Sequence, residues 1–224
     1  MFLDGFHLSK MPLLYGSASC CLALNDSRYT EEVVRLRNSA SVNAYIHNDR
    51  LTPGKHESWL DRQLQSNDSI NFAVLIHSDF KGTAALYDIQ PGQRCEYGRL
   101  VMKYDGSRLY TVAIEFLCLS FAFDILGVLE VYCRVVESNT TVMELHRSSG
   151  WSRDNRYTCV LPLNSQQVNH VGFSMHSSVW PHAFHRARPT IARLHNGRNR
   201  PLAYPGSTDH VEPISTAISA SVVT

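Results

Sequence analysis

A polar turn that leads directly into an apolar helix is the first feature of this sequence that could do chemistry. Residues 103–107 are polar and contain a glycine, and the apolar surface of residues 109–125 predicts a helix covered on several sides. The amides and the dipole at a helix N-terminus attract anions. Arg108 stands at the junction and could contact a phosphate directly. The alternative is a surface turn with a solvated arginine.

A short helix expected at residues 139–149 carries two more polar candidates, and Gly150 is suited to end it. Asn139 is a residue type that caps helix N-termini. His146 lies near the other end, and an imidazole titrates close to neutral pH, so it could serve as an acid. A single histidine on a helix is often structural, and both interpretations stay open.

The six cysteines include no CxxC pair and no CxxC…H spacing that would suit zinc. We therefore expect no metal site, and we expect most of the thiols to be small core residues. No positively charged leader with an apolar run opens the sequence. We accordingly expect a cytoplasmic location with reduced thiols.

The composition is that of an ordinary globular chain, with 224 residues, 44% apolar and 18% charged. A formal net charge of +1 argues against nucleic acid as the main partner. We expect an extension at residues 1–14, one domain at 15–195, and a flexible C-terminal tail at 196–224, where Pro, Gly, Ser, Thr and Ala dominate.

The longest apolar stretch, residues 113–136, is interrupted by Glu115, Asp124, Glu130 and Gly127. A membrane-spanning helix needs about 20 nearly uninterrupted apolar residues. We therefore expect a buried helix, a turn and a central strand here, and no membrane partner.

Strands and helices must position these candidates. Apolar spacing predicts helices at residues 31–37 and, after Thr52, from about 56 to 64. Runs rich in β-formers predict strands at 19–24, 71–77, 82–89, 96–102 and 129–136, and one or two more within 160–175.

Two segments resemble the acetyl-CoA half of the GNAT acyltransferase superfamily. They are the strand, turn and helix of residues 96–123 and the segment NTTVMELHRSSGW at 139–151. The superfamily turn usually reads G/RGxGxG/A, whereas here Ser107 and Leu109 stand at both glycine sites. Residues other than glycine can still present backbone amides to a pyrophosphate when their dihedrals are helical.

Within that superfamily, the closest resemblance is to the pseudaminic acid pathway N-acetyltransferases that act on UDP-4-amino-4,6-dideoxy-N-acetyl-altrosamine. VRLRNSASV, LTPGKHESWLDRQL and HVGFSMHSSVW carry this narrower match, which spans about residues 15–188. The resemblance implies an α/β (α+β) fold with a single mixed, mostly antiparallel central sheet flanked by helices. This sheet is splayed between its fourth and fifth strands.

The resemblance also implies catalytic roles. Acyl transfer to an amine needs a base for the amine, a polarised carbonyl and a proton for the thiolate. Glu96 stands where similar enzymes carry an acidic residue that deprotonates the amine, directly or through water. His146 stands where many carry a tyrosine that protonates the thiolate. Alternatively, Glu96 is a strand carboxylate that only forms a salt bridge, and His146 is a structural histidine.

Binding roles follow from the same resemblance. Backbone groups of Val101 and Met102 would hold the acetyl carbonyl and the pantetheine arm, and Asn139 would bond the pantetheine amide. The pyrophosphate of acetyl-CoA would lie against Ser107, Arg108, Leu109, Tyr110 and Thr111. Residues on the acceptor side would be Arg37, Asn38, His56 and Trp59, whose aromatic face and basic groups suit a nucleotide. The alternative is that Trp59 is a core residue and His56 is a surface histidine.

The predicted function is transfer of an acetyl group from acetyl-CoA to the amino group of a UDP- or dTDP-linked amino sugar, by direct attack in a ternary complex. This resemblance leaves a homodimer open as the assembly. Two other functions remain: a GNAT that acetylates a protein N-terminus, a small amine or an antibiotic, and an inactive GNAT-like protein that binds CoA. The missing glycines are the feature that keeps the last one open.

Overall fold

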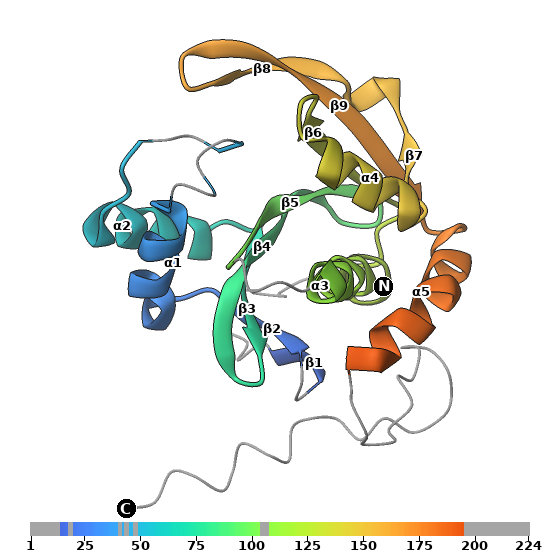
Figure 1. The fold of residues 1–224 in the computed structure, drawn as a ribbon, viewed down its shortest axis with the longest axis horizontal. Helices are drawn as coiled ribbons and strands as arrows, with labels where there is room; N and C mark the ends of the chain where they lie inside the picture. The colour runs from blue at the N-terminus through green and yellow to red at the C-terminus, as the bar shows by residue number, and fades with distance from the viewer. Residues whose placement is uncertain are drawn as a thin grey trace, which may run out of the picture.

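The structure is a computed structural model that describes residues 14–17, 20–39, 42, 45–46, 49–103 and 108–194 (Figure 1). Its strands are β1 Leu14–Ser17, β2 Cys20–Leu24, β3 Ile70–Ile76, β4 Asp79–Gln90, β5 Arg94–Met102, β6 Glu130–Val136, β7 Ser152–Arg153, β8 Cys159–Leu163 and β9 Gln166–His176. Its helices are α1 Thr30–Arg37, α2 Pro53–Leu64, α3 Arg108–Ser120, α4 Thr140–Ser148 and α5 Trp180–Leu194, with short helical turns η2 Ser27–Tyr29, η3 Phe121–Ile125 and η4 Asn155–Tyr157.

In the described part of the chain, the strands form one sheet in the order β1-β2-β3-β4-β5-β6-β9-β7, with β8 paired to β9. Its pairs are antiparallel except β5 with β6, which run parallel. That parallel pairing covers only Arg94 with Glu130, Cys95 with Val131 and Glu96 with Tyr132. Beyond Glu96 the two strands separate, which confirms the predicted splay, because these are the fourth and fifth strands predicted from the sequence.

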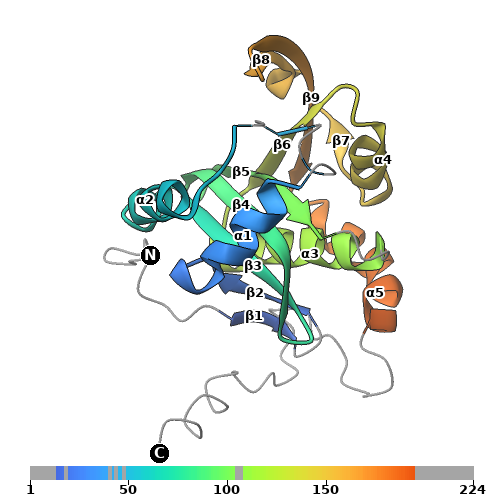
Figure 2. The same ribbon diagram turned by 60° about the vertical axis from the view of Figure 1, so that its left-hand side comes forward.

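Side chains alternate between the two faces of the sheet, as the period of a strand requires. In β3, Phe72 and Val74 belong to the larger apolar core beneath α3, whereas Ala73 and Leu75 belong to a smaller core with α1. The helices α1 and α2 therefore lie on one face, and α3 and α5 lie on the other (Figures 1 and 2). Every residue of β3 is buried, as expected for a central strand covered on both faces.

The turn between β3 and β4 is tighter than the sequence suggested. The predicted connection was residues 78–81, but β4 begins at Asp79 and only His77 and Ser78 lie between the strands. Both have positive φ, 50° and 70°. Positive φ at both central residues is the geometry of a two-residue hairpin turn that matches the twist of its strands.

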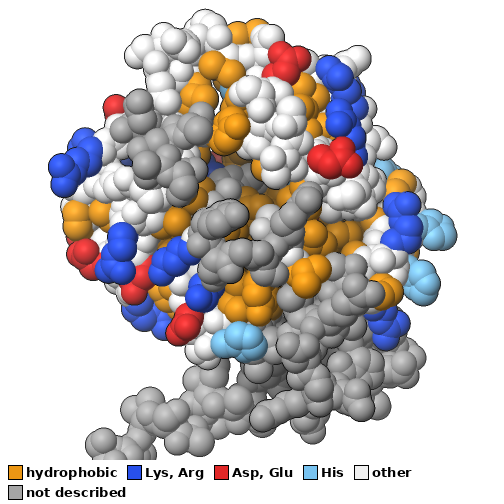
Figure 3. Space-filling model, viewed as in Figure 1, with side chains coloured by type: hydrophobic (Ala, Val, Ile, Leu, Met, Phe, Trp, Pro, Cys, Tyr) orange, Lys and Arg blue, Asp and Glu red, His pale blue; other side chains and the backbone are white. Residues whose placement is uncertain are grey.

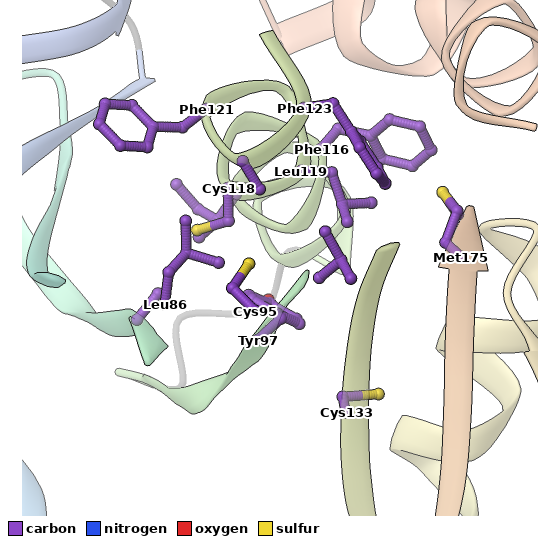
Figure 4. Packing of buried hydrophobic residues seen from close by; sticks show 14 of the residues in the cluster. Leu86, Cys95, Tyr97, Phe116, Cys118, Leu119, Phe121, Phe123, Cys133 and Met175 are labelled. Carbon is purple, nitrogen blue, oxygen red and sulfur yellow. The ribbon is translucent and has the colours of Figure 1, made fainter. Parts of the chain in front are cut away.

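The predicted helix at 109–125 is α3 followed by the π-helical turn η3. The amide of Leu126 donates to the carbonyl of Phe121 at 3.0 Å, a bond across five residues. The core between α3 and the sheet contains Phe121, Cys118, Tyr97 and Leu86 (Figure 4). This covering on several sides explains the apolar surface of the segment.

Three elements were not predicted from the sequence: β1, β7 and α5. The longest of them, α5, contains Pro189 and many histidine and arginine residues, which obscured its pattern. Its Trp180 is 1% exposed and lies against Phe116 and Phe123, with ring centroids 5.6 and 5.5 Å away. Tertiary packing on α3 therefore stabilises this helix.

Among the described residues, no helix is both long and apolar enough to cross a bilayer.

Candidate active site

The candidate site lies where β5 and β6 separate. Glu96 is the last residue of β5 that is paired with β6, so the opening between the strands begins at the next residue, Tyr97. Cys95 and Tyr97 belong to the core beneath α3, and the alternation places Glu96 on the opposite face. The surface seen in Figure 3 is hollowed between the part that carries β8 and β9 and the part that carries α1 and α2.

Glu96 is only 2% exposed and is fully engaged by neighbouring strands. Arg134 of β6 donates to its carboxylate from Nε at 2.9 Å and from a terminal nitrogen, and the hydroxyl of Tyr87 donates at 3.0 Å. The hydrogen bonds to Glu96 raise the pKa of Arg134. Burial, and then the charge of Glu96, raise the pKa of Tyr87. The ion pair accounts for an arginine in a central strand and fixes the orientation of the candidate base.

His146 is buried on the other face, at the last turn of α4. Its ring packs edge-on to Tyr97, with centroids 6.2 Å apart, and lies close to Trp151 and Phe173 at 5.1 and 5.8 Å. Because Glu96 and Tyr97 are consecutive in β5, the two catalytic candidates approach the same point of the strand from opposite faces. The nitrogen Nδ1 of His146 lies 2.9 Å from the carboxylate of Glu115 in α3.

The end of β5 offers free backbone groups on the side of the opening. Val101 and Met102 pair with Thr83 and Gly82 of β4, but the parallel ladder with β6 ended five residues before Val101. An extended arm that bears amide groups could therefore pair with this edge as an additional strand. Asn139 has its predicted capping role, since its side-chain oxygen accepts from the amide of Val142 at 3.3 Å.

The start of α3 offers backbone donors that could bind an anion. The helix begins at Arg108, so the amides of its first turn, up to Thr111, have no partner within the helix. Leu109 is exposed, Thr111 is half-buried, and the hydroxyl of Tyr110 lies 3.5 Å from Nε2 of His77. Ser107 lies outside the described residues, as does the side chain of Arg108. This donor set fits an anion without the glycines of the usual turn.

We expect Tyr110→Pro to lower the affinity for acetyl-CoA about tenfold to a hundredfold, because it removes one amide that would donate to a charged oxygen. Tyr110→Phe keeps that amide, loses only the hydroxyl near His77, and should bind acetyl-CoA like the wild type. Isothermal titration calorimetry measures both. Wild-type affinity in a folded Tyr110→Pro variant would contradict the assignment of these amides to the pyrophosphate.

A cluster of basic and aromatic side chains lies on the α1 and α2 side of β5. It is centred on Arg99, which has a positive φ of 52° at an irregularity between β4 and β5. Arg99 donates to Asn71 at 3.0 Å and to Gln63 at 3.2 Å. Its guanidinium also lies over the rings of Tyr87 and Trp59, at 4.5 and 5.5 Å from their centroids. A bulge in a strand redirects a side chain, and here it turns Arg99 toward α2.

Arg37 and His56 complete this cluster with unmet hydrogen-bonding capacity. The atoms Nε of Arg37 and Nε2 of His56 are buried and have no hydrogen-bond partner among the described residues. Burial, and then the charge of Arg99, lower the pKa of Arg37. Burial, and then the charge of Arg37, lower the pKa of His56. Trp59 stacks on His56 with ring centroids 5.7 Å apart. Arg99 is exposed, Arg37 is half-buried and His56 is buried, so a partly exposed basic cluster with these two buried nitrogens suits an anionic group.

Asn38 has a different place from the other acceptor-side candidates. Its side chain donates to the carbonyl of Leu51 at 2.8 Å and accepts from the amide of Leu51 at 2.9 Å. This pair of bonds ties the end of α1 to the residues that precede α2. In the structure, Asn38 therefore fixes the connection between the two helices.

Three residues of this site were not predicted from the sequence: Arg99, Arg134 and Glu115. Glu115 was visible as a charge within the longest apolar stretch, which argued only against a membrane span, and Arg134 lies within the predicted strand at residues 129–136. Arg99 gave no signal, since its direction depends on a backbone irregularity. Among the described residues, no group of three or more His, Cys, Asp or Glu side chains lies together in a way that could hold a metal ion.

Comparison with known proteins decides the family. A family model, the acetyltransferase (GNAT) domain, matches residues 23–152, more than half of the chain. The chain belongs to the GNAT acetyltransferase family. This GNAT protein is accordingly an acyl-CoA acetyltransferase, and enzymes of its family use acetyl-CoA as the acyl donor. The match spans β2 to the start of β7 and so includes the splay, α3 and α4.

Solved structures share the fold of this GNAT protein at low sequence identity. A GCN5-related N-acetyltransferase from Brucella melitensis is 19% identical, with a TM-score of 0.69 over 83% of this chain and 87% of that chain. Spermidine N-acetyltransferase from Vibrio cholerae, in complex with CoA and spermine, is 14% identical, with a TM-score of 0.65 over 74% of this chain and 99% of that chain. Apo FdhC, a nucleotide-linked sugar GNAT, is 17% identical, with a TM-score of 0.64 over 82% of this chain and 99% of that chain.

Proposed function

We propose that this GNAT acetyltransferase acetylates the amino group of a nucleotide-linked amino sugar. The observation that carries the proposal is the cluster of Arg37, His56 and Arg99, in which two buried nitrogens have no partner among the described residues. The pyrophosphate of a nucleotide sugar carries two negative charges and acceptor oxygens that match these donors. The rings of Trp59 and Tyr87 beside Arg99 offer flat surfaces for a base.

A polyamine acceptor is the main competitor, since the fold is shared with a spermidine N-acetyltransferase. The charge of the acceptor side disfavours it. A polycation bound near Arg37 and Arg99 would meet like charges, which costs binding energy. Acidic side chains would be expected in a polyamine site, but among the ion pairs of the described residues none joins a carboxylate to these arginines.

In the proposed reaction, the amine nitrogen attacks the acetyl carbonyl carbon of acetyl-CoA. A C–N bond forms and the C–S bond breaks. The proton lost by the amine goes to Glu96, directly or through water, and the departing sulfur receives a proton from His146. The backbone of Val101 and Met102 polarises the carbonyl. The products are the N-acetylated sugar and free CoA thiol, and no group besides the two substrates is consumed.

The acceptor class is tested by replacing Arg37 with methionine, which removes the charge and keeps most of the apolar stem. We expect KM for a UDP-linked amino sugar to rise about tenfold or more, since a hydrogen bond to a charged group is lost, while KM for acetyl-CoA stays unchanged. Release of CoA thiol, detected with a thiol reagent, measures both. Arg35→Met is the matched control, because Arg35 is an exposed basic residue of the same helix.

The same assay is run with spermidine and with an N-terminal peptide as acceptors. Turnover of spermidine above that of every UDP- and dTDP-linked amino sugar, unaffected by Arg37→Met, would overturn the proposal.

His56 gives the acceptor affinity a pH dependence of known sign. Burial and Arg37 lower the pKa of His56, so the free protein holds this imidazole neutral at pH 7. A bound pyrophosphate favours the imidazolium and binding therefore takes up a proton as the pH falls. We expect the affinity for the nucleotide sugar to increase from pH 7.5 to pH 5.5. In His56→Gln this pH dependence should be reduced, as measured by calorimetry with the UDP-sugar alone.

A further inference from the structure

We propose that Glu115 is the positioning residue for His146: its buried carboxylate holds Nδ1–H of the imidazole and leaves Nε2 as the nitrogen that exchanges the proton. The catalytic part of this inference rests on the proposed role of His146. The structural part, the state of the imidazole, does not depend on that role.

The carboxylate of Glu115 is completely buried in the middle of α3. It accepts hydrogen bonds from three side chains: Nδ1 of His146 at 2.9 Å, Oγ of Ser149 at 3.2 Å and Nε1 of Trp151. All three donors come from the end of α4 and the residues that follow it. One acidic side chain in α3 therefore organises the segment that carries the candidate acid.

The three bonds determine which nitrogen of His146 carries the proton. The indole of Trp151 can only donate, and the hydroxyl of Ser149 donates to the second oxygen, so both oxygens of Glu115 act as acceptors. A carboxylate that accepts at both oxygens is most simply ionised, and Nδ1 of His146 must then donate to it. Nε2 then carries the lone pair in the neutral ring and the second N–H in the imidazolium.

His146 provides the only cationic side chain that the structure pairs with Glu115, within the described residues. The other titratable groups near the pair are Tyr97 of β5, Cys118 of α3 and Cys133 of β6, and burial raises the pKa of each, so all three stay neutral. On α5, a terminal nitrogen of Arg186 lies beside Gly150, four residues after His146.

A buried carboxylate of this kind costs folding energy unless its charge is balanced, which makes an apolar residue the more stable choice for packing alone. The carboxylate of Glu115 lies 2.9 Å from Nδ1 of His146 and so places an acidic group beside the ring. The packing of the His146 ring against Tyr97 and Trp151 restricts its rotation. The arrangement thus supplies both orientation and charge, as a carboxylate beside an imidazole does in other acyl transfer sites.

The state of the imidazole is tested by nitrogen NMR of the full-length protein labelled with ¹⁵N-histidine. The chain has 11 histidines, so the His146 signals are identified by their loss in His146→Phe. We expect the neutral ring of wild-type His146 to carry its proton on Nδ1. In Glu115→Gln, the neutral ring should show a mixture of the two tautomers. A wild-type neutral ring protonated at Nε2 would overturn the proposal.

The catalytic consequence is tested by pH profiles of turnover. We expect Glu115→Gln to lower kcat about tenfold to a hundredfold, the usual effect of losing the partner that orients a histidine. The pH dependence of turnover should also differ from that of the wild type, because the ring that exchanges the proton is no longer held in one tautomer. Ser149→Ala is the matched control: it removes a hydrogen bond from the same carboxylate without touching His146, and its profile should match the wild type.

A purely structural role for Glu115 gives a different result. Glu115→Gln and Ser149→Ala would then both lower the melting temperature and leave the pH profile of the folded fraction unchanged, which would overturn the catalytic part. If Glu115→Gln does not fold, Glu115→Asp is tested in its place. It keeps the charge on a shorter side chain and should retain the wild-type pH profile of turnover at a reduced kcat. A wild type with the expected tautomer but no turnover of any nucleotide amino sugar would refute the proposed function and leave the Glu115 assignment standing.

Discussion

Replacing His146 by phenylalanine should lower kcat about 100-fold to 10,000-fold, the range that general acid catalysis contributes. The phenylalanine ring can occupy the space among Tyr97, Trp151 and Phe173, so the fold is retained. Acetyl-CoA would be bound at the end of β5 and at the start of α3, so its affinity should stay within about twofold of wild type. Steady-state kinetics and calorimetry with acetyl-CoA measure the two quantities.

The same substitution removes one of the three donors to Glu115, and a buried acceptor that loses a partner costs about 1–3 kcal/mol. His182→Phe is the matched control, because it replaces an exposed histidine of α5 and should leave both stability and turnover unchanged. Turnover near the wild-type value in His146→Phe would mean that water or another group protonates the thiolate. It would remove His146 from the chemical step.

Replacing Glu96 by glutamine is the second substitution for which we expect a large effect, again about 100-fold to 10,000-fold in kcat. Glutamine keeps the size of the side chain and can still accept from Tyr87, but it neither takes a proton nor balances Arg134. The side chain of Arg134 is 31% exposed, so water can solvate part of its unpaired charge, and we expect a modest loss of stability. Single-turnover kinetics with the amino sugar measures the chemical step directly.

Arg134→Gln separates the two roles of Glu96. It breaks the same ion pair and keeps the carboxylate, so its loss of stability should resemble that of Glu96→Gln. Its turnover should remain well above that of Glu96→Gln if Glu96 is the base. Equal turnover in the two variants would show that the ion pair matters only for the fold and that another group, or water, deprotonates the amine.

Much of the scaffold could be predicted from the sequence, because the patterns that indicate its strands and helices are local. The buried strand at residues 130–136, the cap at Asn139 and the helix end before Gly150 follow from burial patterns and capping chemistry within a few residues. The splay was predicted through the resemblance, since the sequence of two strands does not state where their pairing ends. The helix α5 was missed because its apolar residues pack on α3, a contact that its own sequence does not encode.

The candidate site also divides into residues that the sequence indicates and contacts that only the structure shows. Glu96 and His146 were predicted through the resemblance to GNAT enzymes, and the helix start at residues 108–111 was also indicated by the polar turn and apolar helix around it. The pairings that define their chemistry are long-range: Glu96 with Arg134 is separated by 38 residues, and Glu115 with His146 by 31. Only a folded sheet and helix packing bring these charges into contact.

The sequence by itself therefore determined the order of most elements, because helix periods, strand alternation and caps act over distances of a few residues. The family and the two catalytic candidates came from the resemblance of its segments to GNAT enzymes. The tertiary structure decided which charges meet. It buried Glu115 against His146, turned Arg99 toward Trp59 through a backbone bulge, and left Nε of Arg37 without a partner among the described residues. Electrostatic interactions depend on distance and burial in space, and neither quantity is a function of separation along the chain.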